Sequence, residues 1–369
     1  MKYIKLKDVC KINMGQSPDS SSYNESGEGI PFFQGNADFG DRYPVTRIWC
    51  SEPKKVAQEN DILISVRAPI GAINYSKEKC CIGRGLAALT VDKTKISEKL
   101  LFWVLKAKKE ELNRQGTGST FKAISKKSLE ELLIPQIDIK EQEKDVEIFE
   151  KIYMIIQNKH KELKLLTDLI SARFVEMFGD PIRNTQNRPT TKLINVVKMQ
   201  RGFDLPVQDR NQDGNIPVYG ANGVLDSHNT ARIHGGGVIT GRSGTIGKVF
   251  YTEGDYWPLN TSLFSVDKHG NNVIYLAYLL QMFDLTRFVE GTGVPTLNRN
   301  MFHNRQIIDV PINEQNQFAA FVQQVNKSKF VIHKFLYCFI DNKQSIIKPR
   351  LNTKESGKIR GGKPHADEF

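Results

Sequence analysis

The sequence predicts an α+β protein: two tandem, similar α/β domains separated by two long helices that pair as a coiled coil. Motifs repeat about 175 residues apart, each copy holds short β-rich runs between turns, and helical periodicity follows each copy. Because solenoid units are only about 20–50 residues long, this repeat indicates a duplicated domain. The expected division is 1–140 for the first domain, 141–180 for the first long helix, 181–312 for the second domain, 313–347 for the second long helix and 348–369 for a tail.

Short motifs in the same order carry the repeat. Residues 65–73 return as 240–249, which makes Arg67 equivalent to Arg242 and Gly71 equivalent to Gly247. The segment 30–33 returns as 216–219 at an offset of 186, so about eleven extra residues are expected between Pro31 and Arg67. The other pairs are Gly116-Thr117-Gly118 with Gly291-Thr292-Gly293, Leu133-Ile134-Pro135 with Asp309-Val310-Pro311, and Glu141-Gln142 with Glu314-Gln315.

Each copy follows one plan. It begins with an amphipathic segment, continues through a stretch rich in Gly, Ser, Asn and Asp, and then forms β-rich runs. A short helix, the Gly-Thr-Gly loop and a strand ending at Pro135 or Pro311 complete it. The amphipathic segments are 5–12 and 192–199, and the turn-rich stretches are 15–29 and 202–215. The β-rich runs are 61–66 and 237–240, and the short helices are 98–112 and 273–283.

A long helix is predicted after each domain. Apolar residues recur at steps of three and four, a pattern typical of a coiled-coil seam; the alternative is a helix packed only on its own domain. The first helix should run over 141–178 and stop at Gly179-Asp180-Pro181, and the second to about Ile347. The seam residues are Phe149, Ile152, Ile156, Leu163, Leu166, Ile170 and Met177, then Phe318, Phe321, Val325, Ile332, Phe335, Phe339 and Ile346. The tail, charged and without periodicity, is predicted to be disordered.

Composition narrows the class of protein. The formal net charge is +11, with a sequence pI of about 9.2. A basic surplus favours nucleic acid as a partner, although some soluble proteins are simply basic. Without an apolar run near 18–20 residues or a leader segment, we expect a cytoplasmic protein that does not span a membrane. The five cysteines, with no C-x-x-C, predict neither a disulfide framework nor a zinc site.

Catalytic motifs are missing. The sequence has no Asn/Asp-Pro-Pro-aromatic segment of an amino-methyltransferase and no G-x-x-x-x-G-K-[ST] loop. The acidic residues near Asp61 do not complete a metal-dependent nuclease pattern. We therefore expect a non-catalytic binding protein. The alternatives are a single-chain nuclease with a cryptic acidic site and a stand-alone site-specific DNA-binding protein.

The candidate nucleic-acid contacts lie in turns. Glycines in the segment 242–248 let the backbone approach a ligand, and arginine can bind guanine or phosphate through two parallel hydrogen bonds. The amides of 34–36 and 220–222 are suited to adenine. The alternative for these motifs is a tight hairpin with surface side chains. The candidate DNA-binding residues are Gln34, Asn36, Arg67, Arg84, Lys122, Asn222, Arg232, Arg242, Ser243, Lys248, Asn298 and Arg299.

The order of these motifs over about residues 1–347 resembles the specificity (S) subunits of type I restriction-modification systems. The resemblance rests on the I-P-x-[FY] segment, the [ST]-x-R turn ending in glycine, the Gly-Thr-Gly loop and the Glu-Gln pair at each long helix. It implies two target recognition domains, each reading one half of a split double-stranded DNA target, and an antiparallel pair of spacer helices. It also implies a non-catalytic subunit that assembles with two methyltransferase (M) subunits and can be joined by two restriction (R) subunits. S-adenosylmethionine and ATP with Mg²⁺ would then belong to those partners, with no cofactor in this chain.

Overall fold

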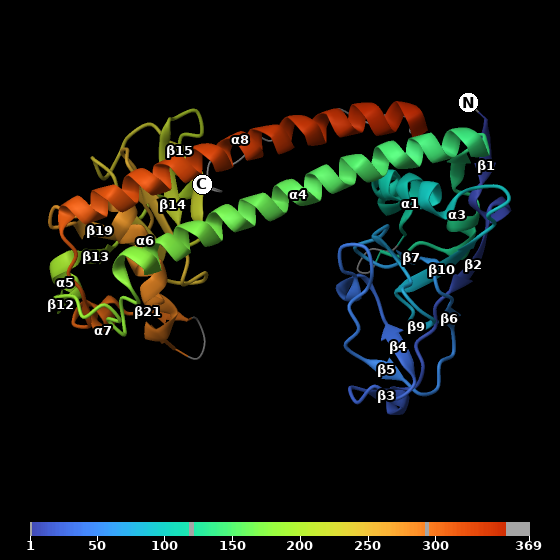
Figure 1. Ribbon diagram of the computed structural model, residues 1–369, viewed down its shortest axis with the longest axis horizontal. Coiled ribbons are helices and arrows are strands. Elements are labelled where there is room, and N and C mark those ends of the chain that lie inside the picture. Colours follow the sequence, from blue (N-terminus) through green and yellow to red (C-terminus); the bar gives the residue numbers. More distant parts are fainter. Residues whose placement is uncertain (1, 118–121, 292–294, 352–369) are drawn as a thin grey trace. The chain divides into compact units, whose positions relative to one another are not determined.

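The structure is a computed structural model that describes residues 2–117, 122–291 and 295–351 (Figure 1). The chain divides into two compact units, and the division falls inside the two long helices, α4 (Ile139–Phe178) and α8 (Ile312–Leu351). Unit 1 comprises Met1–Gln157 and the end of α8 from Tyr337, and unit 2 comprises Asn158–Leu336. Each unit therefore contains one α/β domain and part of both long helices.

Unit 1 is built on a four-stranded antiparallel sheet in the order β2-β10-β7-β8 and a five-stranded sheet in the order β3-β5-β4-β9-β6. A short pair, β1 with β11, brings the start of the domain beside its end. The strands are β1 (Tyr3–Lys5), β2 (Cys10–Met14), β3 (Tyr23–Asn24), β4 (Ile30–Phe33), β5 (Trp49–Cys50), β6 (Val56–Ala57), β7 (Ile62–Ser65), β8 (Ile73–Tyr75), β9 (Cys80–Ile82), β10 (Leu86–Val91) and β11 (Leu133–Pro135). The helices are η1 (Leu6–Asp8), η2 (Ser20–Ser22), η3 (Asn36–Asp38), α1 (Glu98–Ala107), α2 (Lys109–Gln115) and α3 (Lys126–Glu130).

Unit 2 repeats this plan, with a three-stranded sheet in place of the five-stranded one. Its sheets have the orders β13-β19-β16-β17 and β15-β14-β18, and two short pairs, β12 with β22 and β20 with β21, complete it. The strands are β12 (Thr190–Lys192), β13 (Lys198–Arg201), β14 (Ile216–Gly220), β15 (Gly223–His228), β16 (Gly237–Gly241), β17 (Val249–Thr252), β18 (Trp257–Pro258), β19 (Ser262–Asp267), β20 (Val289–Glu290), β21 (Thr296–Leu297) and β22 (Gln306–Ile308). The helices are α5 (Leu193–Val196), η4 (Val207–Asp209), α6 (Val273–Phe283), η5 (Leu285–Phe288) and α7 (Arg299–His303).

The central strands carry consecutive apolar residues because both faces of their sheet are buried. In unit 1, Ile62 and Ile64 of β7 pack into the core with α1, whereas Leu63 packs into a second core with Phe33. In unit 2, Val238 of β16 packs toward α6 and Ile239 packs toward Tyr256. Successive side chains of a strand point to opposite faces, so a strand between two cores needs an unbroken apolar run. The predictions of strands in 61–66 and 237–240 are confirmed.

Backbone register corrects the alignment of the two copies. Ser65 pairs with Leu86, and Gly241 pairs with Ser262, an offset of 176 in both cases. Gly71 and Gly247 keep this offset and have φ angles of 83° and 96°, a region that favours glycine. Phe33 and Tyr219 occupy equivalent places at the offset of 186, because each carbonyl accepts the same cross-strand bond, from Gly83 and Leu259. The first copy therefore carries ten extra residues in between, not eleven.

Three further expectations were wrong in detail. The segment 98–112 forms two helices that are interrupted at Lys108. The strand β22 ends at Ile308, and Pro135 and Pro311 are not equivalent, because Lys5 pairs with Leu133 whereas Lys192 pairs with Gln306. Helix α4 begins at Ile139, and α8 continues past Lys348-Pro349 to Leu351, since a proline near the end of a helix removes few intrahelical bonds. The rest of the predicted tail, 352–369, lies outside the described residues.

A buried glutamine ties each long helix to its own domain. In unit 1, the Oε1 atom of Gln142 accepts a hydrogen bond from Ser97 N at 2.7 Å, and Nε2 donates to Ile137 O at 2.8 Å. In unit 2, Gln315 makes the equivalent bonds to Asn272 N at 2.9 Å and Val310 O at 2.8 Å. Both side chains are 1% exposed. The repeated Glu-Gln motif therefore has a structural reason, which is the satisfaction of buried backbone groups.

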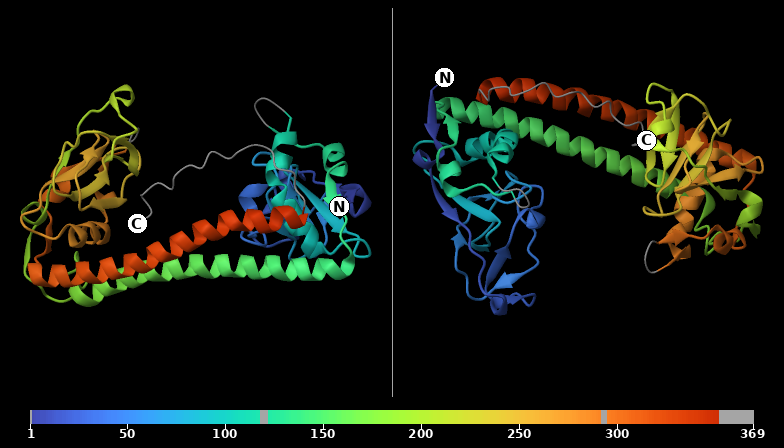
Figure 2. Two further views of the ribbon diagram at one scale, coloured as in Figure 1. Left: turned by 90° about the horizontal axis from the view of Figure 1, so that it is seen from above. Right: turned by 180° about the vertical axis from the view of Figure 1, so that it is seen from behind.

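The two long helices pack together within unit 2, where the end of α4 and the start of α8 lie side by side and run in opposite directions (Figure 2). Phe174 of α4 lies edge-on to Phe318 of α8, with ring centroids 5.4 Å apart. Arg173 lies 5.8 Å from the ring centroid of Phe321, one turn further along α8. For this part of the helices, the predicted pairing is confirmed. The helix stop is also confirmed, because Gly179 has a φ of 74°.

A pH dependence is expected from His303. Its Nε2 atom accepts a hydrogen bond from Met199 N at 3.0 Å beside the bulge between β13 and β19, and its side chain is buried. Burial is the first cause that lowers the pKa of His303 below 6.5, followed by the charges of Arg299 and Lys198. The unfolded chain therefore binds this proton more readily, so stability should fall as the pH drops below about 6.5. Between pH 8 and 5, the free energy of unfolding measured in urea should change less with pH for His303→Gln than for the wild type.

The control for this measurement is His160→Gln, since His160 is exposed on α4. In that variant, the free energy of unfolding should depend on pH as it does in the wild type. The same wild-type dependence in His303→Gln would contradict the role given to His303.

Candidate nucleic-acid interface

Unit 1 contains a surface pocket of about 490 Å³ where four separate segments meet. Four of the candidate residues line it, namely Gln34, Asn36, Arg67 and Arg84. They come from the end of β4, from η3, from the turn after β7 and from the turn before β10. Sheet pairing thus brings together side chains that are up to 50 residues apart in the sequence. Ser17, which the sequence did not single out, also lines the pocket.

The floor of this pocket is fixed by Asp38. Its Oδ2 atom accepts hydrogen bonds from Gln34 N at 2.7 Å and Gly35 N at 3.2 Å, and its Oδ1 atom pairs with Arg47 at 2.9 Å. The only carboxylate that lines the pocket is therefore already neutralised. Within the described part of the chain, no hydrogen bond or ion pair engages the side chains of Gln34, Asn36, Arg67 and Arg84. Their donors face solvent.

The same place in unit 2 is built on equivalent backbone contacts. Gln16 N donates to Ile82 O and Phe203 N to Pro258 O, so the next residues, Ser17 and Asp204, are equivalent. A Cβ atom added to Gly15 or Gly202 would lie 2.2 Å from the facing carbonyl oxygen, so both copies need glycine there. Continuing these registers, the equivalent pairs are Gln34 with Gly220, Asn36 with Asn222, Arg67 with Ser243, and Arg84 with Asn260.

The prediction that Arg67 and Arg242 occupy the same place was wrong by one residue. Val66 N donates to Gly85 O, and Arg242 N donates to Thr261 O, so Arg242 is equivalent to Val66. The isolated bridges agree, since Arg67 pairs with Ala123 and Ser243 with Thr296. A slip of one residue turns a side chain to the other face of the strand. Accordingly, Arg67 is exposed, whereas Arg242 is half-buried and donates from Nε to Asn260 O at 3.0 Å.

The side chains of unit 2 bond to one another where those of unit 1 are open. Asn260 Nδ2 donates to Asp204 Oδ1. Lys248 Nζ donates to Asn222 Oδ1 at 2.9 Å. Arg232 is exposed and lies over the ring of Phe203, 4.5 Å from its centroid. The turns around Asp204 and Asn260 thus carry five of the candidate residues, namely Asn222, Arg232, Arg242, Ser243 and Lys248.

The remaining candidates are placed differently. Asn298 caps α7, because its Oδ1 atom accepts from Asn300 N at 3.1 Å, and its Nδ2 atom donates to Glu290 at 2.9 Å. This amide therefore has a structural role. Arg299 begins α7 and is half-buried. Lys122 is exposed, and its carbonyl accepts from Ala68 N beside the unit 1 pocket. Of the two Gly-Thr-Gly loops, Gly118, Thr292 and Gly293 lie outside the described residues.

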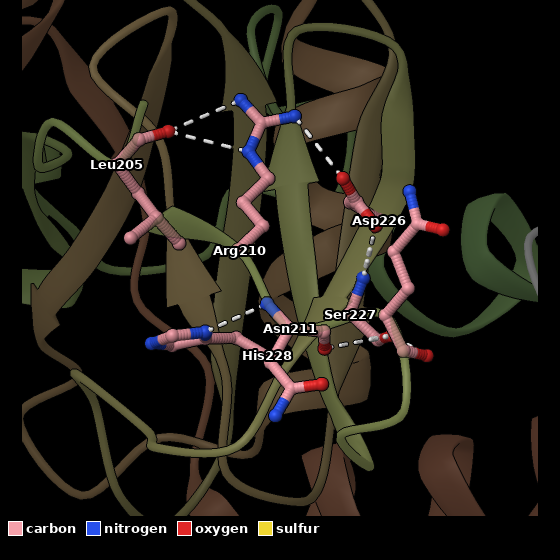
Figure 3. Close-up of polar contacts among 7 residues, drawn as sticks. Leu205, Arg210, Asn211, Asp226, Ser227 and His228 are labelled. Carbon is pink, nitrogen blue, oxygen red and sulfur yellow. Dashed lines mark hydrogen bonds and ion pairs between the residues drawn. The ribbon is translucent and has the colours of Figure 1, made fainter. Parts of the chain in front are cut away.

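The turn-rich segment that follows Asp204 is held by a nearly buried ion pair, which Figure 3 shows. Arg210 and Asp226 approach to 3.3 Å, and their side chains are 12% and 13% exposed. Arg210 also donates twice to Leu205 O at 3.2 Å, while His228 Nδ1 accepts from Asn211 N at 3.3 Å. The positive charge of Arg210 is therefore used inside the protein. This scaffold fixes the loop against β15.

Other chemistry finds little support in the part of the chain that is described. No group of three or more His, Cys, Asp and Glu side chains there could hold a metal ion. Within the same residues, none of the helices combines the length and apolar character that crossing a bilayer requires. The cysteines are all free thiols, buried except for Cys338. Burial raises the pKa of Cys10 to about 12 and that of Cys80 to about 11, so neither thiol is activated.

The two units thus share one α/β frame, with an open polar pocket in unit 1 and different side chains at the equivalent positions of unit 2. The family described as "Type I restriction modification DNA specificity domain" matches residues 1–167 and 189–348. The chain therefore belongs to the type I restriction-modification DNA specificity family.

Individual relatives agree with this assignment. The chain is 46% identical over 152 residues to the putative type I restriction enzyme MjaX specificity subunit of Methanocaldococcus jannaschii, covering 41% of this chain and 36% of that protein. It is 24% identical over 195 residues to the MjaIX specificity subunit of the same organism, covering 49% and 45%. The chain thus spans less than half the length of either curated relative.

A solved S subunit of a type I restriction-modification system from M. genitalium matches with a TM-score of 0.60. The match covers 96% of both chains at 15% identity. It confirms the fold class predicted from the sequence, with two α/β domains and two long helices.

Proposed function

We propose that this chain is the DNA sequence-specificity subunit of a type I restriction-modification complex and recognises a bipartite target. The observation that carries the proposal is the pair of equivalent sites on one duplicated frame, with different side chains at matching positions. A shared frame lets both units approach DNA in the same way, and different side chains let each read a different half-site. The net charge of +11 supports binding to phosphates, which positions a protein on DNA without specifying sequence.

The candidate residues divide between the two half-sites. One half-site would be contacted by the unit 1 residues Gln34, Asn36, Arg67 and Arg84. Lys122 would contact the adjacent phosphate backbone of the DNA. In unit 2, Asn222, Arg232, Ser243 and Lys248 would contact the other, while Arg242 and Asn298 would act mainly by shaping the loops. Arg299 is proposed as a phosphate contact.

The chain would act as a non-catalytic scaffold in the cytoplasm. Two M subunits that use S-adenosylmethionine and two R subunits that use ATP and Mg²⁺ would bring the chemistry, so this chain needs no cofactor. The names of the relatives and the family support this assignment.

The direct test is to map modified adenines across the genome of cells with and without this chain, together with its methyltransferase. A split motif with a fixed gap that disappears with the chain supports the proposal. A continuous motif, or no chain-dependent modification, contradicts it. A Mg²⁺-dependent cleavage assay on the purified chain addresses the nuclease alternative, and we expect no activity.

The long helices should set the unspecified gap. Helix α4 has 40 residues, which corresponds to about 60 Å at ~1.5 Å per residue. Deleting one heptad from each helix, 158–164 and 330–336, removes about 10 Å and preserves the apolar register. We expect the gap to shorten by about three base pairs, at ~3.4 Å each, with the same bases read. Methylation mapping measures this change; Lys161→Ala is the control, and an unchanged gap contradicts the idea.

A further inference from the structure

The two recognition sites differ most in hydrogen-bonding character. Unit 1 has Ser17, Gln34, Arg67 and Arg84 where unit 2 has Asp204, Gly220, Ser243 and Asn260. Two guanidinium groups are thus replaced by a hydroxyl and an amide, and a carboxylate appears where unit 1 has a serine. Because the backbone frame is shared, the side chains at these four positions can be compared directly between the two units.

The unit 1 pocket offers donors. Arg67 and Arg84 are exposed, line the same pocket and have no acceptor on their side chains. Asp38 is occupied by Arg47 and by two backbone amides, so it cannot satisfy either arginine. In the major groove, guanine presents two acceptors, O6 and N7, and arginine is the side chain that bonds both at once. Adenine and cytosine each present a donor there, which an arginine cannot accept.

The unit 2 site offers one donor beside one acceptor. Asn260 gives one amide hydrogen to Asp204 Oδ1, and no other described residue bonds to this side chain, so its second amide hydrogen and its Oδ1 atom are available. Arg242 donates from Nε to the backbone carbonyl of Asn260. Adenine presents the matching pair in the major groove, since N7 accepts and the N6 amino group donates.

We infer that Arg84 and Asn260 are equivalent base-reading positions: Arg84, with Arg67, binds a guanine in one half-site, and Asn260, held by Asp204, binds an adenine in the other. Asp204 is a positioning residue that fixes the amide orientation. This inference rests on the proposed function and adds to it the base that each unit reads.

The test transfers the unit 2 pair into unit 1. The full chain carrying Ser17→Asp and Arg84→Asn is expressed with its methyltransferase, and modified sites are mapped. One guanine of a single half-site should give way to adenine or become degenerate, with discrimination at that position changing roughly 5- to 150-fold. The other half-site should stay the same, and recovery of a methylated split motif shows that both units of the variant are folded. Lys79→Asn, which removes an exposed charge outside the pocket, should leave both half-sites unchanged.

Unit 2 provides an independent arm. Asp204→Ala should weaken discrimination at one adenine in the other half-site, and Asp204→Asn, which keeps an acceptor, should restore it. A merely structural role would lower binding to all sequences and would not be rescued in this selective way.

The outcomes separate the two proposals. If the wild-type chain gives no split motif, the proposed function itself fails. If a split motif is present but the unit 1 variant reads the same bases with uniformly weaker binding, Arg84 contacts phosphate and the inference is overturned. A change at a position other than guanine overturns it as well.

Discussion

Replacing Phe174 by alanine is expected to destabilise unit 2 by about 3–5 kcal/mol, because it removes a fully buried ring from a cluster that joins three helices. The Phe174 ring centroid lies 5.0 Å from that of Phe178, 5.4 Å from that of Phe318 and 6.0 Å from that of Tyr275. These neighbours belong to α4, α8 and α6. Rigid helices cannot collapse into the space, so the cavity persists. Urea unfolding of the full chain measures the loss.

The matched control is Val175→Ala, the next residue on the same helix, which is 44% exposed. We expect it to change stability by less than about 0.5 kcal/mol. Hydrogen exchange can then locate the effect, because amides of α6 should exchange faster in Phe174→Ala while those of α1 should not. Equal losses in the two variants would mean that the helix cluster does not stabilise unit 2.

The duplication could be predicted from sequence because its signals are local and tied to backbone geometry. Gly71 and Gly247 both need a positive φ, and Gln142 and Gln315 both fill the same buried bonding position, so these letters recur. The central strands and the long helices followed from their apolar periods. These features depend on neighbours in the chain, which a sequence displays directly.

Register could not be predicted in the same way. Arg67 and Arg242 are both arginine and lie 175 residues apart, one less than the offset of 176 that the backbone pairing gives. Cross-strand hydrogen bonds fix that pairing, so the two side chains point to opposite faces. A one-residue ambiguity changes no helix or strand boundary, but it decides which side chain lies in the site. Only the pairing of distant strands resolves it.

The candidate site was predicted in part. The arginines and amides at 34, 36, 67 and 84 stood out as side chains that bind nucleic acid, and they do line one pocket. Ser17, Asp204 and Asn260 were missed as site residues because Ser, Asp and Asn are ordinary in turns. Only contacts across the fold identify these residues as part of the site. The backbone N–H of Arg84 donates to Ser17 Oγ, and at the equivalent place in unit 2 the side chain of Asn260 donates to Asp204.

The second large effect is expected where each long helix meets its domain. Gln315→Ala should cost about 2–4 kcal/mol, since it leaves the Asn272 N–H and the Val310 carbonyl buried without partners. Asn271 also loses a bond, of 2.6 Å, to Gln315 Nε2. The same change at Gln142 strips Ser97 N and the Ile137 carbonyl in unit 1.

Urea unfolding of both single variants and the double variant tests this interpretation of the repeated motif. Gln324→Ala, at an exposed position on α8, is the control and should be nearly neutral. Because Gln142 and Gln315 have no common partner and lie in different units, their losses should add to within about 0.5 kcal/mol. A neutral Gln315→Ala would show that water or a shifted backbone satisfies these groups, and the motif would then need a reason outside the fold of each unit.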